Sequence, residues 1–274
     1  MKDNNELSGG SLLLAWQLKG KTVLIVGGGD VASGRIESIL TADASIILIS
    51  PNDGLHPRTK HFLEQYPTRI TYKDRIFSGE QDLANIDMVL TAVDDVEASR
   101  AICQLCRQAK IPVNVADIPP SCDFYFGSQV RDGPLQIMIS TNGQSPKLAN
   151  IIRRRIEKCL PEHAGEAITK VGSLRNKLKE RAPGVGGEVG KRRMRWMIDV
   201  CTAWEMEDLA ALDDDMIARL IDDGWEKGRV PSGAEVGVPP KGPVAATGPG
   251  NLVPIATFVF GALCSAAFFT LRRR

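Results

Sequence analysis

Short apolar runs alternate with helix-like segments along the first half of the chain. Residues 22–26 and 45–49 are continuous apolar runs rich in β-branched side chains, which is typical of strands buried on both faces. The same patterns predict further strands over residues 69–72, 87–93 and 112–116, and helices over residues 31–40 and 96–110. Strands that alternate with helices predict an α/β fold with a parallel, doubly wound sheet of the Rossmann type.

After residue 117 the alternation gives way to a hairpin followed by helices. Residues 124–130 and 135–140 are strand-like, and the turn residues between them predict an antiparallel pair. Ser145 is expected to cap a helix that has Pro146 at its first position. Longer helices over residues 164–182 and 190–226 then complete a C-terminal helical region.

The last part of the chain has a different composition. Residues 228–250 hold six Gly and five Pro, which predicts a linker without a core. Residues 252–271 contain no charged side chain and precede three arginines, so we expect a transmembrane helix over residues 251–274. The alternative is a buried C-terminal helix, but a core helix usually keeps a broader polar stripe.

Composition narrows the class of partner and the compartment. The chain has 34 basic and 33 acidic side chains, a net charge of +1 and 5% aromatic residues, so no nucleic-acid partner is expected. Its six cysteines are scattered, which does not suggest a disulfide scaffold, and the N-terminus resembles neither a signal nor a transit peptide. We therefore expect a cytosolic folded part that is anchored to a membrane by its C-terminal tail.

A glycine-rich turn directly follows the first predicted strand. Gly27, Gly29 and Ala32 fit the G-x-G-x-x-A pattern, in which the backbone approaches a pyrophosphate at a helix N-terminus. The alternative is a glycine turn that binds nothing. Ser50 or Asn52 could bond the adenosine ribose. After the second predicted strand, no arginine that could bind a 2′-phosphate occurs before Arg58, so NAD is favoured over NADP. The expected cofactor-binding residues are Gly27, Gly28, Gly29, Asp30, Val31, Ser50, Pro51, Asn52, Ala92 and Val93.

A carboxylate stands at the C-terminal end of the last predicted parallel strand. This residue, Asp117, lies where open α/β sheets bind their ligands. The chain also contains Val-Gly-Gly-Gly-Asp-Val-Ala, Val-Asn-Val-Ala-Asp, Cys-Asp-Phe-Tyr-Phe-Gly and Ile-Ser-Thr-Asn-Gly-Gln-Ser-Pro. With these motifs, residues 12–160 resemble the fungal siroheme synthases, and the similarity continues more loosely to about residue 226.

The resemblance implies a specific pair of reactions. Members of that family oxidise precorrin-2 with NAD to sirohydrochlorin and then insert ferrous iron to give siroheme, using one cleft between the dinucleotide domain and the helical region. They are homodimers in which the strands after the nucleotide domain form much of the contact. The family's shared catalytic carboxylate corresponds to Asp117. A carboxylate could take the proton released on dehydrogenation, and could accept pyrrole protons or hold transient Fe²⁺ during metal insertion. The chain has no Cys/His cluster with metal-ligand spacing, so no permanently bound metal is expected.

The substrate is a tetrapyrrole rimmed with carboxylates, so basic groups are expected near it. Lys147 and Arg153 lie on the helix that begins after Ser145, although a solvated basic face explains any one of them equally well. The expected substrate-binding residues are Asn114, Ser145, Lys147 and Arg153. Cys122 either contacts substrate or only packs beside its neighbour Asp123; both readings stay open.

These expectations divide the chain into five segments. They are a NAD-binding domain at 1–116, a β dimerisation segment at 117–145, a helical domain at 146–227, the linker at 228–250 and the membrane anchor at 251–274. Two alternative functions stay open: a dehydrogenase that has lost the chelatase step, and a non-catalytic NAD-sensing module on a membrane.

Overall fold

Five parallel strands form the centre of the first part of the chain. A computed structural model describes residues 10–239. The strand order is β3 (Ile70–Lys73), β2 (Ser45–Ile49), β1 (Thr22–Val26), β4 (Met88–Thr91) and β5 (Val113–Val115), and every neighbouring pair is parallel. This topology confirms the predicted α/β fold of the Rossmann type, and it brings the ends of β1, β4 and β5 to one edge of the sheet.

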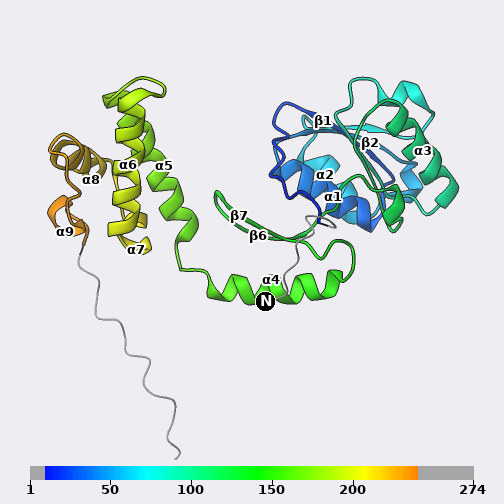
Figure 1. Cartoon of the computed structure of the whole chain (residues 1–274). Coiled ribbons are helices and arrows are strands. Elements are labelled where there is room, and N and C mark those ends of the chain that lie inside the picture. Colours follow the sequence, from blue (N-terminus) through cyan, green and yellow to red (C-terminus); the bar gives the residue numbers. More distant parts are fainter. Residues whose placement is uncertain (1–9, 240–274) are drawn as a thin grey trace, which may run out of the picture. The chain divides into compact units, whose positions relative to one another are not determined.

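Helices cover both faces of this sheet (Figure 1). One face packs on α1 (Asp30–Thr41) and α2 (Pro57–Gln65), and the other packs on α3 (Val96–Gln108). The helix α2 was not predicted, because its sequence is mostly polar and offers only Phe62 and Leu63 to the core. Short 3₁₀ turns occupy the connections at Asn52–Gly54, Glu80–Leu83 and Pro119–Ser121.

A separate antiparallel hairpin follows the sheet. Its strands are β6 (Ser128–Asp132) and β7 (Leu135–Ile139), and α4 (Pro146–Cys159) packs against both. The first strand begins four residues later than predicted, because the preceding segment is bonded to β5. The Asp123 N–H donates to the Val113 carbonyl at 2.8 Å. Ser145 does stand at the N-cap of α4, but its side chain makes no capping hydrogen bond.

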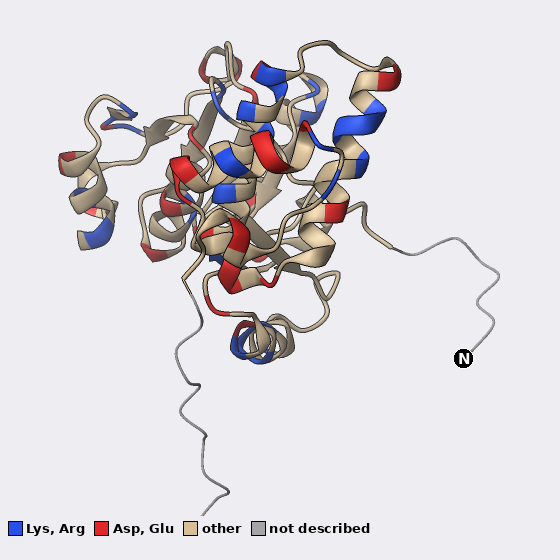
Figure 2. Ribbon diagram, turned by 90° about the vertical axis from the view of Figure 1, so that its left-hand side faces the viewer, with Lys and Arg blue, Asp and Glu red and all other residues tan. Residues whose placement is uncertain are grey.

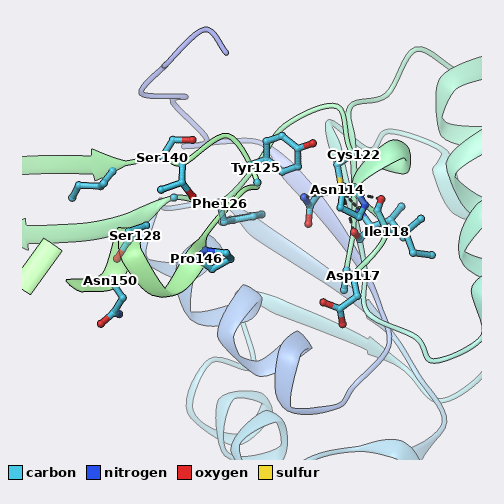
Figure 3. Close-up of a pocket in the computed structure, with 18 of the residues that line it drawn as sticks. Asn114, Asp117, Ile118, Cys122, Tyr125, Phe126, Ser128, Ser140, Pro146 and Asn150 are labelled. Atoms are coloured by element: carbon cyan, nitrogen blue, oxygen red, sulfur yellow. Dashed lines mark hydrogen bonds between the residues drawn. The ribbon is translucent and has the colours of Figure 1, made fainter. Parts of the chain in front are cut away.

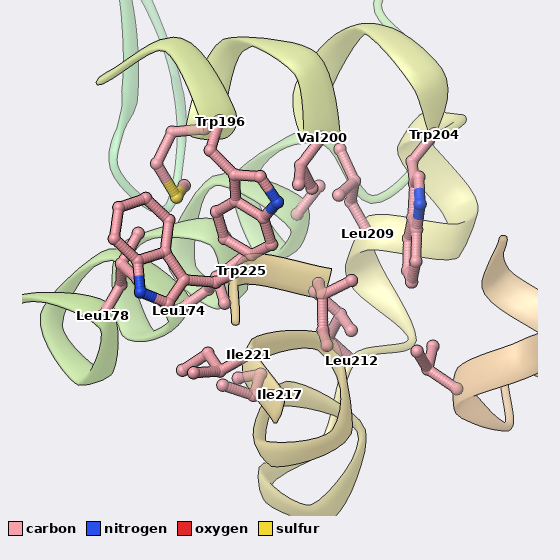
Figure 4. Close-up of a cluster of buried hydrophobic side chains, with 14 of the residues drawn as sticks. Leu174, Leu178, Trp196, Val200, Trp204, Leu209, Leu212, Ile217, Ile221 and Trp225 are labelled. Atoms are coloured by element: carbon pink, nitrogen blue, oxygen red, sulfur yellow. The ribbon is translucent and has the colours of Figure 1, made fainter. Parts of the chain in front are cut away.

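The second part of the chain is helical. Its elements are α5 (Ala164–Arg181), α6 (Gly187–Ala203), α7 (Met206–Ala210), α8 (Asp214–Arg219), a π-helical turn η4 (Leu220–Trp225) and α9 (Gly233–Val236). Their apolar side chains form one core, with Trp196 and Trp225 in edge-to-face contact (Figure 4). The single helix predicted over 190–226 is wrong. The chain leaves α6 at Trp204, whose indole N–H donates to the Pro231 carbonyl. The short helix α7 follows, and Asp213 then caps α8.

The described elements form two compact units that divide between Pro161 and Glu162, and α4 belongs to the first. Lys and Arg lie beside Asp and Glu on several helices (Figure 2). Many of these charges are paired in the second unit, for example Lys177 with Asp214 and Lys227 with Asp223.

The membrane part of the predicted fold class and localisation needs correction. Within residues 10–239, no helix is both long and apolar enough to cross a bilayer. The longest helix, α5, has 18 residues but carries charged side chains along its length. The predicted anchor at 251–274 lies outside the described residues. Over residues 10–239 the fold is an α/β sheet domain, a hairpin and a helical region, and none of its helices could span a membrane.

Candidate active site

The glycine turn after β1 has the geometry of a dinucleotide-binding loop. Gly27 has a φ of +105°, and a Cβ there would lie 2.1 Å from the Ala92 carbonyl oxygen. At Gly29, by contrast, a Cβ would meet no atom within 4 Å. The loop therefore packs tightly against the end of β4 at Gly27. It is open at Gly29, where the phosphates of a ligand could approach the protein backbone.

Two hydrogen bonds from the start of α2 fix the orientation of this loop. The His56 N–H and the Thr59 hydroxyl both donate to the Gly28 carbonyl, at 2.9 and 2.8 Å. The first backbone bond of α1 runs from the Ser33 N–H to the Gly29 carbonyl. The N–H groups of the first turn of α1 thus have no intrahelical partner, and they can bind a phosphate.

The other predicted cofactor residues lie around this turn. Ala92 and Val93 are next to Gly27, and the buried Ser50 is next to Gly28. Asn52 and Pro51 are exposed, as is Val31, while one Asp30 carboxylate oxygen lies 3.9 Å from Nε2 of His56.

Arg58, the first arginine after β2, is engaged with other side chains. Arg58 forms an ion pair with Glu37 at 2.6 Å and stacks over Phe62. This engagement of the guanidinium favours a cofactor without a 2′-phosphate. The residues present fit an NAD cofactor.

A pocket of about 410 Å³ lies beyond the end of β5. Its walls come from the segment after β5, from α1, from the hairpin and from the start of α4. Figure 3 shows Asp117 on one side and Ser128, Ser140 and Asn150 on the other. Such a volume is within the usual range for small-molecule sites.

Asp117 is an exposed residue of this pocket with an uncommon backbone conformation. Its φ is +59°, in the left-handed region. No hydrogen bond or ion pair joins its carboxylate to another described residue, so the backbone alone determines where it points. Strained residues of this kind cluster at functional sites.

Asn114 lines the pocket, but its side-chain amide is bonded to other residues of the protein. It is 4% exposed, and its amide donates to the Phe124 carbonyl at 2.8 Å and to the Cys122 sulfur at 3.4 Å. The Cys122 thiol donates to the Val115 carbonyl at 3.1 Å, and burial raises its pKa. Cys122 therefore both packs against the end of β5 and lines the pocket.

The structure does not bring the other predicted substrate residues into this pocket. Ser145, Lys147 and Arg153 are not among its lining residues, and Arg153 is paired with Glu157 at 2.7 Å. Sequence reasoning missed Arg35, Tyr125 and Phe126, which do line it. Within the described part of the chain, no group of three or more His, Cys, Asp or Glu residues is arranged to hold a metal ion.

Three family models match consecutive parts of the chain. The putative NAD(P)-binding family covers residues 14–128, the sirohaem biosynthesis protein central family covers residues 132–158, and the sirohaem biosynthesis protein C-terminal family covers residues 161–231. The glycine turn and Asp117 both lie within the first of these matches, and β7 and nearly all of α4 lie within the second.

Individual relatives agree with these matches. The siroheme biosynthesis protein met8 of Schizosaccharomyces pombe is 48% identical over 231 residues, which cover 84% of this chain and 85% of that protein. The siroheme synthase of Pseudoalteromonas translucida is 36% identical over 170 residues, but these cover only 34% of that longer protein.

A solved structure shares the fold. The precorrin-2 dehydrogenase SirC superimposes with a TM-score of 0.55 at 22% sequence identity, covering 77% of this chain and 94% of that one. At this identity the match supports the arrangement of the sheet, hairpin and helices, and no more.

Proposed function

Because this chain belongs to the siroheme biosynthesis protein family, we propose that it oxidises precorrin-2 to sirohydrochlorin with NAD and then inserts ferrous iron to give siroheme. The chain acts in siroheme biosynthesis as an NAD-dependent oxidoreductase. Ferrous iron is a substrate of the second reaction and not a resident cofactor.

One observation carries the proposal: the glycine turn and Asp117 stand at the same edge of the sheet. The turn follows β1, Ala92 follows β4, and Asp117 follows β5, and these three strands are neighbours in the sheet. A cofactor on the turn and a substrate in the pocket would therefore be adjacent. The pocket's only acidic side chain among its described lining residues would face that substrate.

The chemistry needs a proton acceptor at this place. When bound, NAD takes up the hydride that leaves precorrin-2. Asp117 accepts the proton released in the same oxidation, because its carboxylate has no competing partner in the described structure. In the second reaction the two pyrrole N–H protons leave as ferrous iron enters the macrocycle, and Asp117 can accept these in turn.

We assign the segment 117–145, together with α4, to a homodimer contact. Leu148, Ile151 and Ile152 on α4 are 55, 38 and 43% exposed in the single chain. Together they form an exposed apolar stripe next to the buried Ala149. A second copy of the chain would cover this stripe.

The test is an Asp117→Asn variant of the full chain. Asn tolerates the left-handed conformation as well as Asp does, so the backbone is preserved while the base is lost. NADH formation with precorrin-2 should fall by roughly 100-fold or more, and metal insertion into sirohydrochlorin should fall with it. NAD affinity should stay the same.

Asp43→Asn is the matched control. Asp43 is also exposed and left-handed, with a φ of 61°, but it lies between α1 and β2, away from the pocket. Near wild-type oxidation by Asp117→Asn would overturn the role of this residue. Absence of NADH formation by the wild-type chain would overturn the dehydrogenase function, and loss of oxidation alone would separate the two reactions.

A further inference from the structure

Arg35 is a basic residue of the pocket that the chemistry above leaves without a role. It comes from the second turn of α1, and the only charged side chains among the described lining residues are Arg35 and Asp117. A pocket with one cation and one carboxylate is suited to a ligand that carries its own negative charge and also loses a proton.

The Arg35 guanidinium has no hydrogen-bond or ion-pair partner among the described residues. Its face lies over the Phe126 ring, with 3.9 Å between the guanidinium carbon and the ring centroid. Stacking fixes the plane of the group and leaves its N–H edge unbonded. Arg35 is half-buried and lines the pocket, so this unbonded edge can donate to an acceptor on a ligand.

Arg35 and Asp117 lie near each other in the pocket without pairing. Burial lowers the pKa of Arg35, while the neighbouring Cys122 and Asp117 oppose that change. The Asp117 carboxylate is close enough to act on the guanidinium electrostatically, but the two do not form an ion pair. Both charged groups are therefore available to the same ligand.

The position of Arg35 separates it from the cofactor site. It lies six residues beyond Gly29, which is about 9 Å along the helix axis. The glycine turn contributes no residue to the pocket, and the neighbours of Arg35 all follow β5. A phosphate at the N-terminus of α1 would thus occupy a different place.

We propose that Arg35 binds a peripheral carboxylate of the tetrapyrrole and so orients the macrocycle over Asp117. The planar N–H edge of a stacked guanidinium matches a carboxylate in two parallel hydrogen bonds. Arg35 is then a specificity-determining residue for carboxylate-bearing tetrapyrroles. This assignment rests on the function proposed above.

The test measures binding of sirohydrochlorin to the full chain by absorbance titration. Arg35→Met keeps a long apolar stem against Phe126 but removes the donors, and it should weaken binding roughly 10- to 100-fold. Arg35→Lys keeps the charge but loses the planar edge, and it should weaken binding less than Arg35→Met. The control is Arg154→Met, on an exposed position of α4, which should bind like the wild type.

Two further measurements distinguish recognition from structural effects. The methyl ester of sirohydrochlorin lacks the carboxylates, so wild type and Arg35→Met should bind it equally. NAD affinity and the thermal unfolding midpoint of Arg35→Met should match those of the wild type.

Several results would overturn this role for Arg35. One is an Arg35→Met variant that binds sirohydrochlorin as tightly as the wild type. Another is an Arg35→Met variant whose affinity for the methyl ester, or for NAD, falls as much as its affinity for sirohydrochlorin. If the wild-type chain oxidises precorrin-2 while Arg35→Met binds normally, only this inference fails. If the wild-type chain neither oxidises precorrin-2 nor binds sirohydrochlorin, the proposed function itself fails.

Discussion

Two residues at the functional edge of the sheet have backbone conformations that most residues avoid. Gly27 has a φ of +105° and Asp117 has a φ of +59°. For a residue with a side chain the left-handed region costs roughly 1–2 kcal/mol. The bond from the Ala116 N–H to the Thr91 carbonyl, at 2.9 Å, holds the chain beside Asp117 against β4. The sheet thus fixes the turn that presents the carboxylate.

The first and third glycines of the turn should respond oppositely to alanine. Gly27→Ala places a Cβ 2.1 Å from a backbone oxygen at a positive φ, so the free energy of unfolding should fall by roughly 3 kcal/mol or more. Gly29→Ala meets no protein atom within 4 Å and should change that free energy by less than about 1 kcal/mol. Its Cβ would stand where the cofactor's phosphates approach.

Urea unfolding and NAD titration check both variants. Gly29→Ala should weaken NAD binding roughly tenfold, which corresponds to about 1.4 kcal/mol. Normal NAD affinity in a stably folded Gly29→Ala variant would show that the phosphates do not pass over this residue.

Sequence patterns could locate residues of this site only where local structure dictates their place. The glycine spacing and the end of an apolar strand were sufficient for Gly27, Gly29 and Asp117. Arg35 looks like any polar position of an amphipathic helix, and only the tertiary fold brings Phe126 over it. Lys147 was expected near substrate on charge alone, but it does not line the pocket.

At the scale of elements, strands were easier to predict than helices. The buried strands of the sheet are continuous apolar runs, and β1 and β2 have the predicted bounds. The helix α2 is held by its contacts with Gly28 and has little apolar periodicity of its own. The region 190–226 has helical character throughout, and its breaks arise from tertiary hydrogen bonds such as that of Trp204.

Asp82 organises the connection between β3 and β4. Its side chain is 2% exposed and accepts hydrogen bonds from Arg75, from the Ser78 N–H and from the Ser78 hydroxyl. The Arg75 guanidinium, helped by Ser78, holds the pKa of Asp82 well below its usual range. Because the pKa of Asp82 is lower in the folded than in the unfolded protein, its ionised form stabilises the fold at any pH above the unfolded-state pKa of about 4. This stabilisation is lost as the pH falls through the folded-state pKa.

Asp82→Asn should therefore lower the free energy of unfolding by about 2–4 kcal/mol at neutral pH, because it leaves Arg75 without its charged partner. The loss of stability of the wild type between about pH 5 and pH 2 should become shallower in the variant. Urea unfolding at several pH values measures both, with Asp43→Asn as the exposed control. A variant that keeps the wild-type slope would contradict the assignment.

At the scale of the whole molecule, the apolar stripe of α4 is the feature that a single chain leaves unexplained. Leu148, Ile151 and Ile152 repeat at helical spacing, as expected of a helix with one buried face. The face of α4 that is buried against the hairpin instead carries the small residue Ala149. A symmetric dimer would cover the stripe with the same surface of a second copy.

Ile152→Glu should convert such a dimer to monomers. In a two-fold contact, one substitution places two negative charges in the interface. If burying both charges costs about 3 kcal/mol in total, association weakens roughly 100-fold. Light scattering should then give 29.8 kDa in place of twice that mass. Arg154→Glu, at an exposed position off the stripe, should leave the mass of the dimer unchanged.

The consequences for activity follow from where the stripe lies. Ser140, Pro146 and Asn150 line the pocket from β7 and α4, so loosening this contact should reduce precorrin-2 oxidation. The glycine turn lies on β1 and α1, and NAD affinity should therefore persist in the monomer. A wild-type chain that is already monomeric would exclude the dimer. An Ile152→Glu chain with unchanged mass but a lower unfolding midpoint would instead show that the stripe packs against another part of the same chain.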